Sequence, residues 1–447
     1  MFKIHLPDSV QFIIQTIEQA GFEAYAVGGC VRDSILGRIP DDWDITTSAK
    51  PDMVKKLFRH TVDTGIQHGT VTVLIGKECY EVTTYRIDGE YEDSRHPKEV
   101  NFTSLLSEDL KRRDFTINAM AYNEAHGLVD LFNGQEDLEK GIIRCVGNPE
   151  ERFTEDALRI MRAVRFSAQL GYEIEANTTA AIKKFAHTLD RISVERIQVE
   201  LVKLLISNHP EYVRKLYELG LTRVFLPEFD VMMETPQNNP HHLYSVGDHT
   251  IAAMKMVNND KILRLTMLLH DVGKPVTRNT DDKGVDHFHG HPTVGSELSR
   301  KILRRLRFDN ETIDRVSLLI LYHDYGNAVS ATPAFTRKLI NKVRMKNFPY
   351  LLSIKYADVM AQSSLQREDK LEKLDTLKKS YEEVVEQGMC ISLKFLAVSG
   401  RDLIEAGMKP GQELGQALNH LLDVVLEDPE MNTKESLMEL IKRWGYI

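Results

Sequence analysis

The sequence has few cysteines and no long apolar run, and these absences exclude several classes of protein. Without C-x-x-C spacing, the cysteines suggest neither a disulfide framework nor a thiolate zinc site, and we expect reduced packing residues. No apolar stretch approaches the length of a membrane span, and residues 1–5 carry no charged leader followed by an apolar run. We therefore expect a cytoplasmic protein with no membrane contact. The four cysteines in 447 residues are Cys30, Cys79, Cys145 and Cys390.

Internal repeats and low-complexity tracts are also missing from this sequence. Its length predicts three or four domains, and 42% hydrophobic with 28% charged residues is typical of a soluble globular protein. A net charge of −9 argues against unselective coating of nucleic acid. Residues 300–307 and 337–346 run the other way, each with five basic residues and no acid. Each of these segments is either a solvated helix face or a contact for RNA phosphates.

The secondary-structure signals change near residue 148. Residues 8–20 predict a helix capped by Asp8 and ended by Gly21. Strand signals follow over residues 24–27, 71–75 and 80–86. Beyond residue 148, periodic apolar segments predict helices to the C-terminus, including an amphipathic helix over 366–385. The sequence thus predicts an α+β fold, in which a mixed sheet with helices precedes an all-α remainder.

Two short runs near the N-terminus predict a nucleotide-polymerising site. Gly28 and Gly29 precede a predicted helix, where backbone amides can approach a triphosphate, and Arg32 can reach the same phosphates. Further along, Asp42 and Asp44 are two residues apart on a predicted strand. Because side chains alternate along a strand, both carboxylates should face the same way. Two such hard oxygen ligands suit Mg²⁺.

Two further segments of the predicted α/β domain carry charges that suit phosphate chemistry. Glu81 offers a third carboxylate for the metal, or a group that orients the first two; an exposed strand acid is the alternative. Residues 109–120 alternate arginine and aspartate beside an apolar segment, which favours paired side chains that fix a loop near phosphate. A charged surface turn is the alternative there. The candidate nucleotide contacts in this segment are Arg113, Asp114 and Asn118.

Residues 155–166 predict a helix that selects the nucleobase. Asp156, Arg159 and Arg162 follow at three-residue steps and would line one side of it. A carboxylate accepts from an exocyclic amino group, and a guanidinium donates to ring nitrogen or carbonyl acceptors. Such a pair would read C or A and disfavour U and G, while Arg165 is a further candidate nucleotide contact. An ordinary salt-bridged surface helix is the alternative.

These motifs, in this order, resemble those of the class II tRNA nucleotidyltransferases, the CCA-adding enzymes, and of the related bacterial poly(A) polymerases. The nucleobase template of that family, E-D-x-x-R, falls on Glu155, Asp156 and Arg159. A last motif resembles residues 192–197, although the continuation 198–200 is less charged than expected. The resemblance spans about residues 20–205. The other family motifs correspond to residues 28–44, 81–86 and 112–118.

The resemblance implies a head domain like that of DNA polymerase β, followed by helical neck, body and tail domains that hold the tRNA acceptor end. It also implies that Asp42 and Asp44 bind two Mg²⁺ ions, which serve the RNA 3′-hydroxyl and the triphosphate. Residues 64–70 resemble the family's flexible loop, whose motion is associated with switching from C to A. Its glycines make mobility reasonable. The loop residues concerned are Gly65, His68 and Gly69.

A second set of candidate metal ligands lies in the middle of the chain. Histidine and aspartate side chains from separate helices can converge on one or two metals and leave positions open for water and phosphate. The ordered series resembles an HD-type phosphohydrolase domain, which hydrolyses phosphomonoesters or cyclic phosphates; a role in metal-linked stability or RNA contact is the alternative. His287 and His289 are rival candidates for the middle ligand. The candidate ligands are His249, His270, Asp271, His291 and His323.

We therefore interpret the chain as a tRNA nucleotidyltransferase that adds C, C and A from CTP and ATP, with Mg²⁺ as cofactor, a second divalent metal in the HD domain and no obligate protein partner. Alternatives are an A-only or CC-only enzyme, a poly(A) polymerase, and an HD phosphohydrolase that uses its head to bind RNA. We expect four domains: a head (1–147), a neck and body for nucleobase and acceptor binding (148–236), an HD domain (237–345) and a tRNA-binding tail (346–447).

Overall fold

The computed structural model describes residues 3–88, 100–326, 331–389 and 391–447, and the chain divides into two units, Met1–Pro227 and Glu228–Ile447. Cys390 lies outside the described residues. Cys30 and Cys145 are buried free thiols, as predicted, whereas Cys79 is exposed. No helix in the described ranges is both long enough and apolar enough to cross a membrane.

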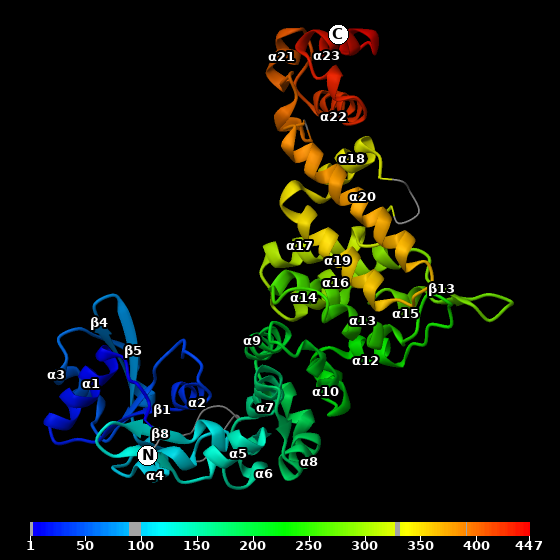
Figure 1. Cartoon of the computed structure of the whole chain (residues 1–447). Coiled ribbons are helices and arrows are strands. Elements are labelled where there is room, and N and C mark those ends of the chain that lie inside the picture. The colour runs from blue at the N-terminus through cyan, green and yellow to red at the C-terminus, as the bar shows by residue number, and fades with distance from the viewer. Residues whose placement is uncertain (1–2, 89–99, 327–330, 390) are drawn as a thin grey trace. The chain divides into compact units, whose positions relative to one another are not determined.

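A mixed seven-stranded sheet forms the N-terminal part of the first unit, with strand order β3-β4-β5-β2-β1-β8-β9 (Figure 1). β2 and β5 are parallel, and the other neighbouring pairs are antiparallel. The strands are β1 (Ala24–Val27), β2 (Ile45–Thr47), β3 (Thr61–Gly65), β4 (Thr70–Ile75), β5 (Glu78–Thr84), β8 (Met120–Asn123) and β9 (Gly127–Asp130). Two small pairs lie apart from this sheet: β6 (Arg86–Asp88) with β7 (Val100–Phe102), and β10 (Ile142–Ile143) with β11 (Glu173–Ile174).

Short helices accompany the sheet in the first part of the unit, and a helical segment follows it. The first group comprises α1 (Asp8–Gln19), α2 (Gly29–Ile35), α3 (Pro51–Leu57), α4 (Leu106–Lys111) and α5 (Gly134–Lys140). The helical segment comprises α6 (Pro149–Glu155), α7 (Leu158–Leu170), α8 (Ala176–Phe185), α9 (Val194–Leu205), α10 (Val213–Glu218) and α11 (Thr222–Phe225). α12 (Pro227–Glu234) follows at the junction of the two units.

The core of the first unit follows from strand alternation and helix amphipathicity. α1 buries Val10, Ile13, Ile14 and Ile17 on one face and packs against β1. One buried cluster joins side chains from the strands with a side chain from α4. Its members are Tyr25, Val27, Tyr85, Leu110 and Ala121.

Three local predictions for this unit are wrong in detail. Asp8 is the first residue of α1 and not its cap, because Pro7 occupies the cap position. β2 begins at Ile45, so Asp42 and Asp44 precede the strand; the hydrogen bond from the Val27 amide to the Asp44 carbonyl (2.9 Å) still continues the ladder. The predicted helix over 155–166 is two helices, because α6 ends at Glu155 and the Asp156 carboxylate caps the amide of Leu158 at 3.0 Å.

The second unit is helical apart from one short pair, β12 (Asn279–Thr280) with β13 (Asp286–His287), among its described residues. In this unit α16 packs on α17, and α13, α14 and α19 pack on one another. Its helices are α13 (Val246–Met254), α14 (Lys261–Leu269), α15 (Lys274–Thr277), α16 (His291–Arg305), α17 (Asn310–Tyr322), α18 (Pro333–Val343), α19 (Phe348–Ala361), α20 (Arg367–Glu386), α21 (Gly400–Glu405), α22 (Gln412–Glu427) and α23 (Lys434–Arg443).

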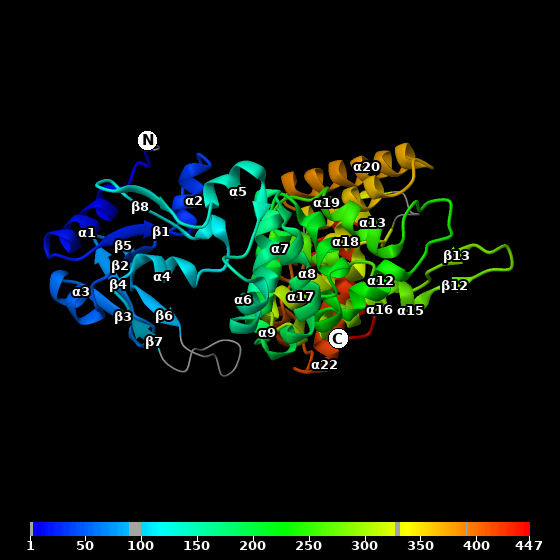
Figure 2. The same ribbon diagram turned by 90° about the horizontal axis from the view of Figure 1, so that it is seen from below.

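The long helix α20 follows α19 and runs toward the C-terminal helices of the same unit (Figures 1 and 2). Its apolar face matches the predicted amphipathic helix, with Leu377 buried and Tyr381 stacked on Phe348 at 4.5 Å between ring centroids. Helices α21, α22 and α23 share a separate apolar core that includes Leu403, Leu421 and Leu437.

Several side chains of the two basic segments make contacts within the protein. Arg300 pairs with Asp314 (2.7 Å) and Arg305 pairs with Glu228 (2.6 Å). Arg337 is buried and donates to the carbonyl oxygens of residues 426 and 427, both at 2.8 Å. These contacts favour a structural reading for those three arginines.

Candidate active site and metal centre

A cleft of about 600 Å³ in the first unit gathers most of the residues predicted to bind nucleotide. Both acidic and basic side chains reach it, from α2, from the segment before β2 and from α7. The predicted residues that line it are Gly28, Gly29, Arg32, Asp42, Asp44, Arg113, Asp114, Asn118, Arg162 and Arg165.

Gly28 lets an arginine approach the backbone beside the first helix turn. Its φ of 83° lies in the left-handed region, and a Cβ there would come within 2.9 Å of a guanidinium nitrogen of Arg113. Arg113 in turn lies 3.6 Å from the buried carboxylate of Asp109, which also accepts from Thr46 at 3.0 Å. The glycine and the buried aspartate therefore fix Arg113 at the cleft wall.

Asp42 and Asp44 directly precede β2, and Glu81 lies within the neighbouring strand β5. β2 and β5 run parallel with Ile45 opposite Val82, so Asp44 and Glu81, each one residue earlier in the chain, are neighbours. Desolvation by surrounding protein raises the pKa of the Glu81 carboxyl, and Asp44 and Asp42 raise it further. Desolvation also raises the pKa of Asp44, which Arg113 lowers and Asp42 raises. This crowding of negative charge is what a divalent cation would relieve.

The trio is nevertheless wider than a closed metal site. Within the described ranges, Asp42, Asp44 and Glu81 do not form a group of three whose ligand atoms all lie within 4.8 Å of one another. A cation held by all three would require a change of rotamer, whereas Glu81 can orient its neighbours without one.

A buried network anchors the phosphate-facing wall of the cleft to α7. Asp114 accepts from Asn118 at 3.1 Å and from Arg162 at 2.6 Å. Burial alone would raise the pKa of Asp114, but Arg162, the Asn118 amide and Arg159 lower it to about 2. Arg32 donates to the Asn118 side-chain oxygen at 2.7 Å. Two of the candidate phosphate-binding arginines are thus oriented by the same aspartate–asparagine pair.

Phe166 is a site residue that the sequence reasoning missed. Its buried ring has the guanidinium of Arg165 over it at 3.5 Å from the centroid, and those of Arg32 and Arg162 at 5.1 and 5.2 Å. Such cation–π packing is favourable and helps to fix the positions of the guanidinium groups. An aromatic residue one position after a predicted binding arginine was the available signal.

The predicted nucleobase readers do not line the cleft in this structure. Arg159 is buried and donates to Glu155 at 2.6 Å and to the carbonyl of Arg112 at 3.0 Å. Asp156 accepts from Arg196 at 2.8 Å. The two side chains are therefore engaged with different partners and not with each other, and their role in base selection remains a prediction.

The α9 helix explains the last motif, whose role was open. Arg196 holds Asp156, and the buried Glu200 accepts from Arg165 at 2.8 Å. Glu200, in the continuation that is less charged than expected, is thus the partner of a candidate nucleotide contact. α9 is thus tied by ion pairs to the residue two positions before α7 and to an arginine within α7.

The predicted flexible loop is an irregular connection between β3 and β4. Residues Ile66–His68 form one 3₁₀ turn, and the register shifts between Val62 and Gly65. Gly69 has a φ of 84°, and a Cβ there would meet the Phe102 ring at 2.7 Å. The turn therefore depends on glycine at residue 69.

The second unit brings the five predicted histidine and aspartate ligands together in a buried cluster. Nε2 of His270 lies 3.2 Å from Asp271, and Nε2 of His291 lies 3.3 Å from Nε2 of His323. The other ring nitrogen of His270, His291 and His323 faces a backbone carbonyl at 2.7–2.8 Å. Those carbonyls accept a hydrogen, so each Nε2 presents a lone pair to the cluster. Two lone pairs facing each other at 3.3 Å repel unless a cation or proton lies between them.

Asp358 completes the cluster and was not predicted. Its carboxylate lies 2.9 Å from Nε2 of His249 and is contributed by α19. The ligand atoms form two groups, each within 4.8 Å: His249, His270 and Asp358, and then Asp271, His291 and His323. His270 belongs to the first group and the next residue, Asp271, belongs to the second. Two adjacent groups of three ligands suit a two-metal site. The signal that was missed is a buried aspartate in a largely apolar helix.

His287 and His289, the rivals for the middle ligand, lie elsewhere. His287 pairs with Asp281 at 3.0 Å, and its ring stacks on that of His289 at 5.7 Å. Both line the cavity that opens onto the cluster, but neither belongs to the two ligand groups of the described chain.

Three family models match successive parts of the chain. The poly A polymerase head domain matches residues 24–144, the RNA and SrmB-binding site of polymerase A matches 171–233, and domain 2 of tRNA nucleotidyltransferase matches 293–441. The CCA-adding enzyme of Lactobacillus helveticus is 36% identical over 96% of this chain and 95% of its own length. The chain belongs to the CCA-adding enzyme family. The enzyme of Levilactobacillus brevis is also 36% identical, over 98% of each chain.

Solved structures agree with this assignment. The Bacillus stearothermophilus CCA-adding enzyme in complex with CTP is 30% identical, covers 97% of each chain and gives a TM-score of 0.75. The Thermotoga maritima CCA-adding enzyme complexed with tRNA is 19% identical with a TM-score of 0.60, and supports the fold alone. The predicted α+β fold with a nucleotidyltransferase head, and the predicted CCA-adding nucleotidyltransferase activity, are confirmed.

Proposed function

We propose that the cleft of the first unit transfers CMP and AMP from CTP and ATP to the 3′ end of tRNA, with Asp42 and Asp44 as the Mg²⁺ ligands and Glu81 beside them. The supporting observation is the meeting of Asp42 and Asp44 with an arginine cluster in one cleft. Mg²⁺ held there would assist the attacking 3′-hydroxyl and neutralise charge on the triphosphate. The RNA 3′-oxygen bonds to the α-phosphorus as pyrophosphate leaves. Because its substrates are tRNA and nucleoside triphosphates, we expect the enzyme to act in the cytoplasm.

The arginines divide the work of holding the triphosphate. The guanidinium groups of Arg32, Arg162 and Arg165 all lie within 5.2 Å of the centroid of the Phe166 ring, so their charges converge on one region of the cleft. Arg113 lowers the pKa of Asp44, so its charge acts on the metal-binding carboxylates, and we assign it to the phosphate nearest the metal. We assign base selection to Asp156 and Arg159: they lie next to the network, since Arg159 lowers the pKa of Asp114, and binding of a base would draw them from Arg196 and Glu155.

Incorporation of labelled nucleotide tests this function. The protein is incubated with Mg²⁺, each NTP alone or in combination, and tRNA that lacks its 3′ C-C-A end. Full CCA addition from CTP plus ATP is expected, and no addition from UTP or GTP. Addition of C only, or of A only, or growth of a long A tail would support one of the alternative transferases, and failure to incorporate any nucleotide would sink the proposal.

We further propose that the six-residue cluster of the second unit binds divalent metal and hydrolyses phosphate esters. Three Nε2 lone pairs fixed by backbone carbonyls, beside two carboxylates, carry this proposal. Imidazole-rich sets favour transition metals such as Mn²⁺, Fe²⁺ or Co²⁺. Bound metal would supply an activated water and an electrophile for the phosphoryl oxygens. Lys274, 2.7 Å from Asp271, adds a cation beside the cavity.

Metal content and phosphate release test the second function together. We expect about two equivalents of transition metal per chain in the wild type, and Asp358→Asn to lose one of them together with most phosphate release. Asp281→Asn, which removes the exposed partner of His287, is the matched control and should retain both. Wild-type protein that binds no metal above background would contradict the proposal.

A further inference from the structure

The cations that line the cleft of the first unit fall into two groups. Four arginines are each held by a carboxylate of the protein, at N–O distances of 2.6–3.6 Å, which fixes their geometry and offsets part of their charge. Arg38 and Lys203 line the same cleft, but both are exposed, and neither side chain has a hydrogen-bonding or ion-pair partner among the described residues. We call these two the unpaired cations. The paired set is Arg32, Arg113, Arg162 and Arg165.

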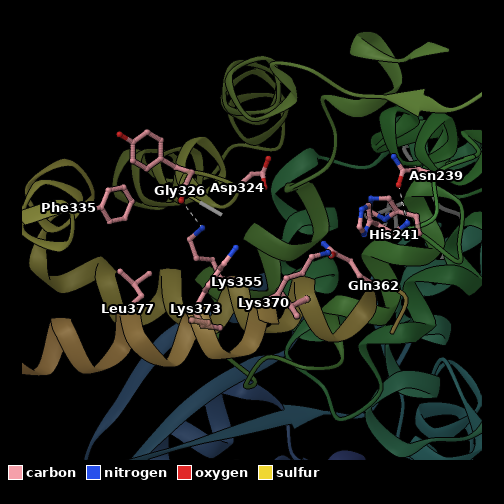
Figure 3. A pocket seen from close by; sticks show the side chains of 14 residues that line it. Asn239, His241, Asp324, Gly326, Phe335, Lys355, Gln362, Lys370, Lys373 and Leu377 are labelled. Carbon is pink, nitrogen blue, oxygen red and sulfur yellow. Dashed lines mark hydrogen bonds between the residues drawn. The ribbon is translucent and has the colours of Figure 1, made fainter. Parts of the chain in front are cut away.

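The side pocket of the second unit shows the contrast. This pocket has a volume of about 270 Å³, and Figure 3 shows Lys355 and Lys370 among the residues that line it. The Lys355 ammonium donates to the carbonyl oxygens of His323 and Tyr325 at 2.8 and 2.9 Å. The Lys370 ammonium donates to the Gln362 side chain at 2.6 Å. Both lysines are thus engaged within the protein, whereas the unpaired cations of the cleft keep their full charge for a ligand that arrives from outside.

The loop between α2 and β2 carries one of the unpaired cations together with the proposed metal ligands. Two backbone hydrogen bonds close the end of α2: the Gly37 amide donates to the Ser34 carbonyl at 3.1 Å, and the Arg38 amide donates to the Asp33 carbonyl at 2.8 Å. The left-handed φ of 69° at residue 37 makes this turn possible. Arg38 and Asp42 are four residues apart, so their Cα atoms lie within about 14 Å of each other. The Arg38 backbone is therefore anchored close to the proposed metal site, while its side chain extends into solvent.

The next residue of this loop is apolar and exposed. Ile39 is 93% exposed, the highest value among the large apolar side chains of the described chain, and it lines the same cleft. Isolated apolar residues are common on protein surfaces, but this one lies beside a cation at the mouth of a charged cleft. The face of a base or ribose laid over it would remove apolar surface from water. The loop thus offers a cation for a phosphate and an apolar side chain for the nucleoside attached to that phosphate.

We propose that the unpaired cations and Ile39 hold the 3′-terminal nucleotides of the acceptor RNA, and so position its 3′-oxygen beside Asp42 and Asp44. The inference rests on the proposed transferase and adds the residues that bind its RNA substrate. The paired arginines are fixed in place, which suits a triphosphate that enters the same position in every cycle. Long unpaired side chains can follow a strand whose 3′ end grows, because contacts with phosphate position the RNA without reading its sequence.

Binding of tRNA that lacks its 3′ C-C-A end, measured by fluorescence anisotropy at several salt concentrations without nucleotide, tests the two cations independently of turnover. Arg38→Met and Lys203→Met should each weaken binding about fivefold and lower the slope of log Kd against log salt by about 0.7–0.9, because one phosphate contact releases about that number of counterions. Arg59→Met, which removes an exposed arginine outside the cleft, is the matched control and should bind like the wild type. A salt slope that stays at the wild-type value in both cleft variants would overturn the inference.

The same titration separates the apolar contact from the charged ones. Ile39→Ser should weaken binding about threefold and leave the salt slope unchanged, because burial of apolar surface releases no counterions. Leu131→Ser is the matched control, since Leu131 is 52% exposed and lies outside the cleft, and it should bind like the wild type. Equal affinities of Ile39→Ser and the wild type would overturn the part of the inference that concerns Ile39.

Steady-state kinetics distinguish RNA from the triphosphate as the ligand of the unpaired cations. Arg38→Met and Lys203→Met should raise KM for tRNA about fivefold and change KM for CTP less than about twofold. A higher KM for CTP with an unchanged KM for tRNA would assign these cations to the triphosphate and overturn the inference. If the wild type incorporates no nucleotide, the proposed transferase falls, while the anisotropy still decides whether these residues bind RNA. If the wild type incorporates CMP and AMP but all variants bind tRNA equally, the transferase stands and this inference falls.

Discussion

The two sites of this chain handle phosphate with opposite kinds of residues. The cleft of the first unit combines solvent-exposed carboxylates with arginines stacked around Phe166, so the protein itself supplies the positive charge for a triphosphate. The cluster of the second unit is buried and built mainly from imidazoles. Carboxylates prefer Mg²⁺, whereas imidazoles suit transition metals. We therefore expect the two sites to bind different metals, and a substitution in one site to leave the activity of the other unchanged.

The largest effect is expected at the carboxylate pair. Asp42→Ala should lower incorporation of CMP and AMP into tRNA at least about a thousandfold, because a metal ligand is lost. The side chain is exposed, so the free energy of unfolding should hardly change. Asp41→Ala, the exposed neighbour, is the matched control and should keep most activity. Comparable loss in both variants would mean that general negative charge, and not a specific ligand, matters there.

Base selection should depend on Arg159 more than on the rest of the arginine set. Arg159→Ala should reduce the preference for CTP and ATP over UTP and GTP about tenfold, because a guanidinium that donates to the base edge is lost. Rates with all four triphosphates, measured separately, check this. Arg191→Ala, in which an exposed side chain beside Asp190 is removed, is the control. Unchanged selectivity of Arg159→Ala would rule out the assigned role.

The buried aspartate of the first cleft should stabilise only its own unit. The pKa of Asp114 is lowered from 3.8 to about 2 by Arg162, the Asn118 amide and Arg159 against the effect of burial. Its contribution, about 2 kcal/mol, is therefore present above about pH 4 and lost as pH falls toward 2. Asp114→Asn should remove this stability at pH 7 and flatten its pH dependence.

The two tryptophans make that prediction measurable, because Trp43 lies in the first unit and Trp444 in the second. Urea unfolding of Asp114→Asn, followed through fluorescence in chains that keep one tryptophan, should shift the Trp43 transition and leave the Trp444 transition in place. An equal shift of both would show that the units do not unfold separately.

The smallest effect concerns the glycine of the loop between β3 and β4. Gly69→Ala combines a left-handed φ with a 2.7 Å approach to Phe102, whereas Gly76→Ala has only the left-handed φ of 64° and nothing within 4 Å. We expect a cost of about 1 kcal/mol for Gly76→Ala and about 2 for Gly69→Ala in the free energy of unfolding. If the loop serves the switch from C to A, Gly69→Ala should also slow AMP addition more than CMP addition. An equal loss of unfolding free energy in the two variants would show that the contact with Phe102 does not contribute to the cost.

Local patterns predicted much of this molecule. The change from strand to helix texture near residue 148 and the carboxylates before Ile45 were readable because each depends on neighbours in sequence. The histidine series was readable for the same reason. His270 and His323 each follow the end of a helix, and Nδ1 of each faces the carbonyl of the residue three positions earlier. Even so, Asp156 was misplaced, although an aspartate that caps the next helix was a visible signal.

Long-range contacts could not be predicted in the same way. Asp358 reaches the cluster from a helix 109 residues after His249, and Glu200 reaches Arg165 across 35 residues. Neither partner is marked by spacing, because helix packing and not local periodicity brings them together. The side pocket beside α20 is likewise a product of packing, and its lysines look in sequence like an ordinary solvated helix face.

The independence of the two sites is tested most directly by measuring one variant of each site in both assays. Asp42→Ala and His291→Ala proteins, with the wild type, are each assayed for nucleotide incorporation into tRNA that lacks its 3′ end and for phosphate release from a phosphate ester. The account predicts that Asp42→Ala loses incorporation and keeps phosphate release, and that His291→Ala does the reverse. Loss of both activities from either single substitution, in a protein that remains folded, would contradict it.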